Sequence, residues 1–162
     1  MNIIVVCDEL IRDMRTLTLF YPISADMLDM DGFSGMFHLH YPNIPRSLRE
    51  KKALCVGNIY KFSHRNPMFY SYPFVVKEKS FSKVSVGSYK SALLRFKEIL
   101  RKERVHSFDI PLLGVSTDNV SWLELKDVLQ SVFADFNGVC YVHVHPTLKY
   151  LIERYDRSVE IY

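Results

Sequence analysis

Apolar and polar residues follow one another along this chain in blocks that predict strands and helices in turn. Runs rich in apolar and β-branched residues predict strands at residues 2–7, 17–21, 53–62, 68–76, 107–113 and 139–144. We expect Pro22 to end the second of these strands, because proline cannot donate to a strand ladder. A loop is predicted over residues 24–35 and a turn over residues 63–67, where Gly, Pro, Asn and Asp punctuate the pattern.

Helices are predicted where apolar residues recur at three- and four-residue spacing. Residues 88–104 show this spacing, with Lys and Arg on the opposite face. The apolar positions are Ala92, Leu93, Phe96, Ile99 and Leu100. Ser121 and Glu124 fit a capping box, in which each side chain accepts a hydrogen bond from the other residue's amide, and an amphipathic helix follows. Shorter helices are predicted over residues 46–52 and 146–155.

The alternation of strands and helices predicts a layered α/β domain. A chain of 162 residues suits one domain, and 48% hydrophobic with 24% charged residues excludes a disordered protein. No apolar run approaches the roughly 20 residues of a membrane helix. Cys7, Cys55 and Cys140 each stand alone in an apolar run, so we expect buried, reduced thiols in a soluble cytoplasmic protein.

The net charge of +3 conceals an uneven distribution. Between Lys77 and Arg104 there are nine basic and three acidic residues, so this segment carries +6 and the rest of the chain carries −3. A basic segment of this kind attracts phosphate groups or nucleic acid. A solvent-exposed helix face that binds nothing accounts for the same charges equally well.

An apolar strand, a small polar loop and a capped helix follow one another over residues 109–122. The first amides of a helix have no acceptor within it, and the helix dipole adds partial positive charge there. This junction therefore predicts a seat for an anion such as a phosphate group. Because many such junctions bind nothing, an empty loop is the alternative.

The same junction resembles the second ligand loop of macro domains, which bind ADP-ribose: residues 110–114 read IPLLG, and Trp122 follows eight residues after the glycine. Other similar runs occur in matching order: VVCDEL at residues 5–10, ISAD at 23–26, GFSG at 32–35 and YSYPFVVKEK at 70–79. The resemblance spans roughly residues 2–144. It implies a three-layer α/β/α domain with a central mixed sheet over residues 1–145, with residues 146–162 as an extension of the same domain.

Within that family, the chain is most similar to the lysine/aspartate type of ADP-ribosyl glycohydrolase, which includes terminal ADP-ribose protein glycohydrolase and the DNA ADP-ribosyl glycohydrolase antitoxins. In that branch a lysine acts on the anomeric carbon of the distal ribose, and an aspartate in the second loop completes the step. Lys77 and Asp118 stand at these positions. The resemblance also implies that Asp8 contacts the adenine. It implies that the distal ribose is bound by Ser24, Gly32, Ser34 and Gly35, and that the diphosphate is bound by Gly114, Val115, Ser116, Thr117 and Asn119.

The sequence departs from the family pattern at several positions. Cys7 replaces the usual glycine before the adenine-site aspartate, and Ser116 replaces the second glycine of the diphosphate loop. Residues 28–31 look like an insertion in the first ligand loop. Lys79 and Lys83 are alternative counterparts of the catalytic lysine. The simpler interpretation of Lys77 and Asp118 is a solvent-exposed lysine and an aspartate that only stabilises its own turn.

Two histidine pairs and one aromatic group have simpler explanations than ligand binding. His38 with His40, and His143 with His145, place two imidazoles on one face of an extended segment, a spacing that metals can use. No cysteine or acidic residue accompanies either pair at ligand spacing, so we expect no metal site, and we expect His143 to line the interior beside the ligand cleft. Aromatic residues on the strand before the basic segment are predicted to pack in the core: Tyr70, Tyr72 and Phe74.

The resemblance predicts a protein that binds ADP-ribose and hydrolyses an ADP-ribosyl linkage on protein, on nucleic acid or on a small derivative, with no cofactor. The bond that is broken can join the ribose to a carboxylate, a nucleobase, a phosphate or an acetyl ester. A non-catalytic module that binds ADP-ribose or a related nucleotide is the alternative. If ADP-ribose does not bind, the basic segment 77–104 predicts a nucleic-acid or protein contact instead, and no membrane association is expected.

Overall fold

The computed structural model describes residues 1–28, 32–51 and 54–162. Within these residues one sheet is formed by β1 (Asn2–Cys7), β2 (Thr18–Ser24), β3 (Phe62–His64), β4 (Phe69–Lys77), β5 (Ser107–Pro111) and β6 (Val139–Val144). The strand order is β1-β6-β5-β2-β4-β3. Neighbouring strands are parallel except at the edge, where β3 is antiparallel to β4, and this confirms the expected mixed sheet.

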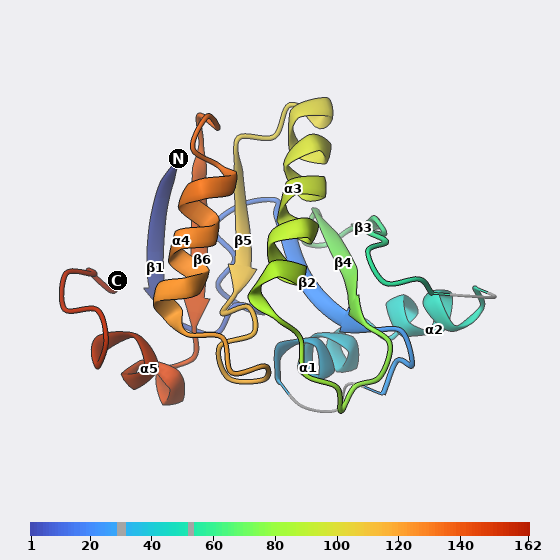
Figure 1. The fold of residues 1–162 in the computed structure, drawn as a ribbon. Coiled ribbons are helices and arrows are strands. Elements are labelled where there is room, and N and C mark those ends of the chain that lie inside the picture. The colour runs from blue at the N-terminus through green and yellow to red at the C-terminus, as the bar shows by residue number, and fades with distance from the viewer. Residues whose placement is uncertain (29–31, 52–53) are drawn as a thin grey trace.

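Helices cover both faces of the sheet (Figure 1). α1 (Gly32–His40) and α2 (Asn43–Arg49) lie on one face, and α3 (Val86–Glu103) and α4 (Trp122–Val132) lie on the other. A 3₁₀ helix, η1 (Pro146–Leu148), and the short helix α5 (Tyr150–Glu153) follow β6. The predicted three-layer α/β/α arrangement is therefore confirmed.

Alternating side chains of β2 enter two separate hydrophobic cores. Phe20 points into the core under α3 and α4, where its ring stacks between Phe74 and Phe96 at centroid distances of 4.2 and 4.1 Å. Tyr21 and its odd-numbered neighbours point into the core under α1 and α2, where Tyr21 contacts Phe37 edge to face. The aromatic residues of β4 behave as expected, since Tyr72 and Phe74 are buried and Tyr70 is half-buried against the first core.

The residues after β6 pack onto the same domain. Ile152 of α5 is fully buried in the first core. At the end of the chain, the Cys7 amide donates to the Tyr162 carbonyl at 2.7 Å, and the Tyr162 amide donates to the Val5 carbonyl at 3.0 Å. The segment therefore adds backbone hydrogen bonds to the outer edge of β1.

The predicted capping box at the start of α4 is confirmed. The Glu124 amide donates to Ser121 Oγ at 3.1 Å, and the Ser121 amide donates to Glu124 Oε2 at 2.8 Å. These two contacts satisfy amides that have no acceptor within the helix. α4 therefore begins directly after Ser121, at the end of the loop that follows β5.

Pro22 does not end its strand, and that prediction is wrong: β2 continues through it to Ser24. Within the described residues, β2 pairs with β5 only at Leu19 and Asp109. Pro22 has no N–H group to donate, but it is not paired with β5, so no hydrogen bond of the sheet is lost on the β5 side. A strand accepts proline in this situation.

The predicted strand over residues 53–62 is also wrong. β3 shares only Phe62 with the predicted strand and extends into the predicted turn, and the residues from 54 to 61 contribute one isolated bridge, from Ile59 to Phe74. Residue 53 is outside the described residues. Apolar content alone did not distinguish this irregular segment from a strand, because it contacts the edge of β4 without a continuous ladder.

Helix boundaries differ from the prediction in three places. The predicted loop over residues 24–35 gives way to α1 partway along, and the proposed insertion at residues 28–31 lies outside the described residues apart from Leu28. The helix predicted over residues 46–52 begins earlier, at Asn43, and residue 52 is not described. The helix predicted over residues 146–155 is divided into η1 and α5.

The three cysteines are free thiols in different environments. Cys140 is buried and Cys7 is half-buried, but Cys55 is exposed, so the expectation of three buried thiols is wrong at this position. Cys55 is exposed because it belongs to the irregular segment and not to a strand. Among the described helices, none combines the length and the apolar character that crossing a bilayer requires.

Candidate functional site

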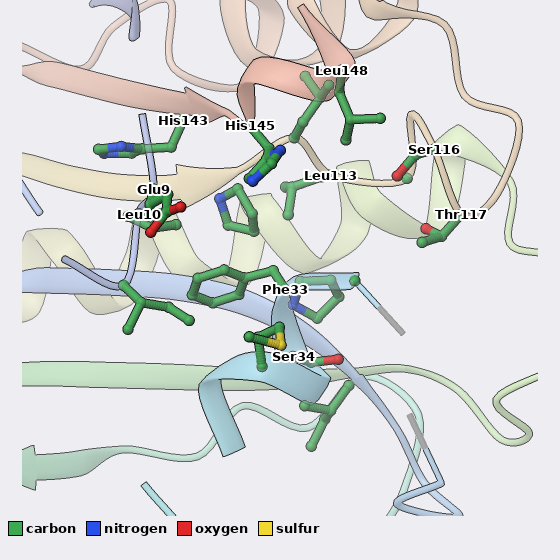
Figure 2. A pocket seen from close by; sticks show the side chains of 18 of the residues that line it. Glu9, Leu10, Phe33, Ser34, Leu113, Ser116, Thr117, His143, His145 and Leu148 are labelled. Atoms are coloured by element: carbon green, nitrogen blue, oxygen red, sulfur yellow. The ribbon is translucent and has the colours of Figure 1, made fainter. Parts of the chain in front are cut away.

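A cavity of about 450 Å³ opens where β1, β2, β4, β5 and β6 end (Figure 2). Parallel strands present their carboxyl ends at one edge of a sheet, so residues far apart in sequence meet there. The walls are mainly apolar and include Phe33, Leu113 and Leu148, and the charged side chains of Asp8 and Lys77 lie among them. A few polar groups within apolar walls are typical of a site for a small molecule.

Most of the residues proposed from the sequence line this cavity. They are Asp8, Gly32, Ser34, Lys77, Gly114, Ser116, Thr117 and Asp118. Figure 2 shows Ser34 on the α1 side and Ser116 and Thr117 across from it on the loop after β5. Four proposed residues are not among the described residues that line it: Ser24, Gly35, Val115 and Asn119.

Ser24 is fully buried and contributes to the loop beside the cavity. Its hydroxyl donates to Asp26 Oδ1 at 2.7 Å, and Asp26 Oδ2 accepts from the Ser80 amide at 2.9 Å. Burial raises the pKa of the Asp26 carboxyl, but the hydrogen bonds from Ser80, Ser24 and Leu28 outweigh it and leave that pKa lowered. Asp26 therefore joins the loop after β2 to the segment after β4.

Lys77 and Asp118 meet at the wall of the cavity. Lys77 ends β4 and Asp118 lies in the loop between β5 and α4, and Lys77 Nζ lies 3.4 Å from Asp118 Oδ1. The two side chains are 12% and 1% exposed respectively, so the pair is shielded from bulk water. An ion pair in such a place is stronger than one on the surface, because fewer water molecules screen it.

Asp118 receives further hydrogen bonds from three directions. The Val84 amide donates to Oδ1 at 3.3 Å, the Thr117 hydroxyl donates to Oδ2 at 3.3 Å, and the hydroxyl of the buried Tyr89 makes a short bond to Oδ2. These donors hold the carboxylate in one orientation. Tyr89 also lines the cavity, and the sequence reasoning did not identify it.

The loop after β5 turns back on itself at Gly114. The Gly114 carbonyl accepts from the Asp118 amide at 2.9 Å and from the Val120 amide at 3.1 Å. Gly114, Ser116 and Thr117 of this loop line the cavity, so an anion bound there lies beside their backbone. Asn119 takes the left-handed backbone conformation, with φ of 57°, whereas Ser116 does not, so the serine at 116 introduces no backbone strain.

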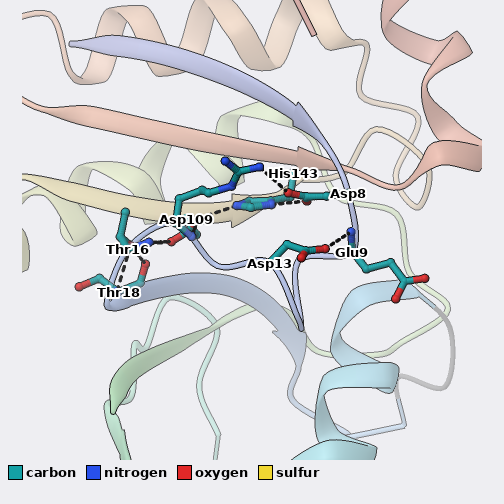
Figure 3. Close-up of polar contacts among 8 residues, drawn as sticks. Asp8, Glu9, Asp13, Thr16, Thr18, Asp109 and His143 are labelled. Carbon is teal, nitrogen blue, oxygen red and sulfur yellow. Dashed lines mark hydrogen bonds and ion pairs between the residues drawn. The ribbon is translucent and has the colours of Figure 1, made fainter. Parts of the chain in front are cut away.

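Asp8 follows β1 and is half-buried in the cavity wall. Its Oδ1 lies 2.5 Å from His143 Nδ1, and its Oδ2 lies 3.4 Å from Arg15 Nη2. The other imidazole nitrogen of His143 lies 2.5 Å from Asp109 Oδ1, so one ring joins two carboxylates (Figure 3). His143 is in the interior beside the cavity, as the sequence predicted.

Asp109 is a buried acidic residue that sequence reasoning did not single out. Its side chain is fully buried and accepts hydrogen bonds from the Arg15 amide at 3.0 Å, the Thr16 amide at 2.8 Å and the Thr16 hydroxyl at 2.5 Å. A signal for it was available, since an aspartate between Phe108 and Ile110 in a buried strand requires compensating donors.

Lys83 and Lys79 differ from Lys77 in position. Lys83 is exposed and donates to the Thr117 carbonyl at 2.6 Å, so it braces the loop from outside. Lys79 is exposed, and neither residue is among the described residues that line the cavity. Several other basic side chains of segment 77–104 are also engaged: Arg95 donates to the Gly57 carbonyl, and Lys97 and Arg101 contact Asp135.

The two histidine pairs do not form comparable units. His38 and His40 lie in α1, so the expectation of an extended segment is wrong for them, and His38 Nε2 lies 2.9 Å from the Tyr21 hydroxyl. His145 lines the cavity and caps η1, where its Nδ1 accepts from the Thr147 amide at 3.3 Å. In the part of the chain that the structure describes, no group of three or more His, Cys, Asp or Glu side chains could hold a metal ion.

The arrangement of this domain is that of a macrodomain: a mixed six-stranded sheet between two helical layers, with the cavity at the carboxyl ends of the strands. The macrodomain of Mycobacterium tuberculosis DarG superposes with a TM-score of 0.78 at 16% identity, over 87% of this chain and 96% of that one. The macrodomain of Thermus aquaticus DarG gives a TM-score of 0.75 at 19% identity, over 89% and 98% of the two chains.

Thermosipho africanus DarTG, solved in complex with ADP-ribose, gives a TM-score of 0.74 at 16% identity, over 90% of this chain and 42% of that one. No family model and no curated protein matches the sequence. Identities this low establish a shared fold, and the chemistry has to be argued from the residues of this cavity.

Proposed function

We propose that this protein binds ADP-ribose in the cavity and hydrolyses an ADP-ribosyl linkage, acting on a modified protein, a modified nucleic acid or a small ADP-ribose derivative. The observation that carries the proposal is the contact between Lys77 and Asp118 at the cavity wall, 3.4 Å apart. The sequence resemblance assigned these two residues to catalysis, and the fold is shared with a protein solved with ADP-ribose.

The proposed ligand fits the chemistry of the walls. A cavity of about 450 Å³ is within the range of small-molecule and cofactor sites. Asp8 accepts from the adenine amine at one end, and the backbone of the loop over residues 114–119 holds the diphosphate beside the positive end of α4. Gly32 and Ser34 border the distal ribose, and Ser24 supports that side through Asp26.

In the proposed reaction, Lys77 acts at the anomeric carbon of the distal ribose and Asp118 transfers the proton. An ammonium group cannot attack, so Lys77 first passes a proton to Asp118. The amine forms a bond to the anomeric carbon while the bond to the linked group breaks, and the departing group receives the proton from Asp118. Water then releases ADP-ribose and restores the Lys77 amine. A lysine that keeps its proton acts differently, by stabilising the charge that develops as the bond breaks.

Single-turnover release of ADP-ribose from modified protein and modified DNA tests this proposal. We expect Lys77→Ala and Asp118→Asn each to slow release by about 100-fold or more, because each removes a group that transfers a proton or forms the bond. Calorimetric binding of ADP-ribose should persist in both variants. Lys79→Ala is the matched control, since Lys79 is exposed outside the cavity. Unchanged release in both active-site variants would exclude the assigned roles.

Borohydride during turnover distinguishes the two roles of Lys77. Attack by the amine produces an imine with the opened ribose, and its reduction leaves a permanent adduct on Lys77 that mass spectrometry detects. Full turnover without an adduct indicates that Lys77 keeps its proton and acts through its charge.

A non-catalytic module that binds ADP-ribose is the second candidate, and one observation favours it. Both Asp118 oxygens already accept hydrogen bonds within the protein, and Lys77 is held against one of them. A carboxylate engaged in this way is suited to holding the cavity wall in place. Binding of ADP-ribose without release from any ester, phosphate or nucleobase linkage would select the module.

A nucleic-acid contact through segment 77–104 is the remaining proposal from the sequence. Several of its basic side chains are engaged within the protein, and Lys77 itself faces the cavity. The contact would therefore rest on exposed residues such as Lys90 and Lys102. An affinity for DNA that falls steeply with salt would support it.

A further inference from the structure

We propose that His143 is a positioning residue that fixes Asp8 as a hydrogen-bond acceptor toward the cavity, so that the site selects ligands with an amine donor over those with a carbonyl at the same position. This inference rests on the proposed function for the identity of the ligand. Its structural part concerns the unliganded protein and can be tested without any ligand.

His143 is enclosed between two carboxylates. Its side chain is 1% exposed, with Asp8 Oδ1 2.5 Å from Nδ1 and Asp109 Oδ1 2.5 Å from Nε2. An ionised carboxylate only accepts hydrogen bonds, and a ring nitrogen satisfies it only by carrying a proton. Two carboxylates therefore call for a proton on each ring nitrogen.

Asp109 prevents the ring from turning. It is fully buried on β5 and is held by the Arg15 amide and by the amide and hydroxyl of Thr16 (Figure 3). The segment that carries these donors also contributes residues 9–12 to the cavity wall. Asp109 therefore fixes both the His143 ring and the backbone that follows Asp8. Residues that contact a ligand-binding side chain from behind commonly orient it in this way.

Asp8 is consequently held in one orientation. His143 lies at its Oδ1 and the Arg15 guanidinium lies 3.4 Å from its Oδ2, and its own side chain is 12% exposed toward the cavity. Flanked by two donors, it has no proton to offer a ligand. An amine such as that of adenine donates to it, whereas a carbonyl in the same place faces an acceptor and leaves both groups unpaired.

Two measurements test the inference. The first is the ¹⁵N spectrum of the His143 ring in the unliganded protein at pH 7, assigned through bonds to its backbone; we expect protons on both nitrogens. The second is calorimetry with ADP-ribose and with inosine diphosphate ribose, which replaces the adenine amine with a carbonyl. We expect the inosine compound to bind about tenfold more weakly or worse, the usual effect of losing a hydrogen bond to a charged group.

Asp8→Asn gives a sharper prediction. With its side-chain oxygen held at His143, the asparagine places its NH₂ where Oδ2 lies in the native protein, 3.4 Å from the Arg15 guanidinium. The variant loses the acceptor that an amine needs, so its preference for ADP-ribose over the inosine compound should disappear. His106→Gln is the matched control, because His106 is exposed and away from the cavity, and it should retain the preference of the native protein.

The outcomes separate this inference from the proposed function. A His143 ring nitrogen without a proton would overturn the inference, and so would equal affinity of the native protein for the two compounds. If ADP-ribose does not bind at all, the proposed function fails, and the ring spectrum alone decides whether His143 holds Asp8 as inferred.

Discussion

Gly114 determines the shape of the cavity wall through a contact that a side chain would prevent. Its backbone has a φ of +69°, and an added Cβ would lie 2.7 Å from Tyr89 Cε2 and 2.9 Å from Val120 Cγ2. Tyr89 in turn donates to Asp118. The position of the Asp118 carboxylate therefore depends on the absence of a side chain four residues earlier.

Gly114→Ala is expected to lower the free energy of unfolding by about 1–3 kcal/mol, because it combines a left-handed backbone with a close contact. Urea denaturation measures the loss. Gly87→Ala is the control: Gly87 lies in the first turn of α3, its Cβ would meet Ser85 Oγ at an ordinary 3.6 Å, and alanine there should be neutral or slightly stabilising. Equal stabilities of the two variants would contradict this account.

At the scale of elements, Asp156 joins the segment after β6 to α4. Its Oδ2 accepts from Trp122 Nε1 at 3.0 Å and from Lys126 Nζ at 2.9 Å, and its Oδ1 accepts from the Ser158 hydroxyl at 2.7 Å. The hydrogen bonds from Ser158 and Lys126 lower the pKa of the carboxyl, and the bond from Trp122 adds to this effect. The charged form thus holds the two elements together.

Asp156→Asn should destabilise the protein at pH 7 by about 1–3 kcal/mol. The folded pKa lies below the unfolded value of 3.8, so the charged contact contributes above that pH and is lost as the pH falls through the folded pKa. The difference between variant and native protein, measured by urea denaturation, should therefore narrow below about pH 4. Asp127→Asn, at an exposed position of α4, is the control, and a difference that does not change with pH would count against the contact.

At the scale of the molecule, β2 and β4 contribute to both hydrophobic cores, so the two helical layers depend on the same strands. The segment after β6 is coupled to this unit, since Ile152 is fully buried in the core under α3 and α4. We therefore propose that residues 146–162 unfold together with the rest of the domain.

Ile152→Ala is expected to cost about 2–5 kcal/mol, the range for truncating a fully buried aliphatic side chain. Unfolding should remain a single transition that circular dichroism and Trp122 fluorescence report together. Tyr155→Ala, at an exposed position of the same segment, should have little effect. A separate early transition of the segment would show that it is not part of the cooperative unit.

The elements that the sequence predicted well are those controlled by near neighbours. β1 and β6 match their predicted ranges because each coincides with one continuous apolar run, and the Ser121–Glu124 box depends on residues three positions apart. The failures at Pro22 and over residues 53–62 concern pairing with distant strands, which local pattern does not encode.

The sequence by itself determined the alternation of strands and helices, the capped loop after β5 and a short set of candidate residues. Only the tertiary structure distinguished Lys77 from Lys79 and Lys83, by bringing it to Asp118 across 41 positions of sequence. It alone joined Asp8 to His143, which is 135 positions away. The physical reason is that periodicity and capping act within a few residues, whereas this cavity is assembled where parallel strands end together.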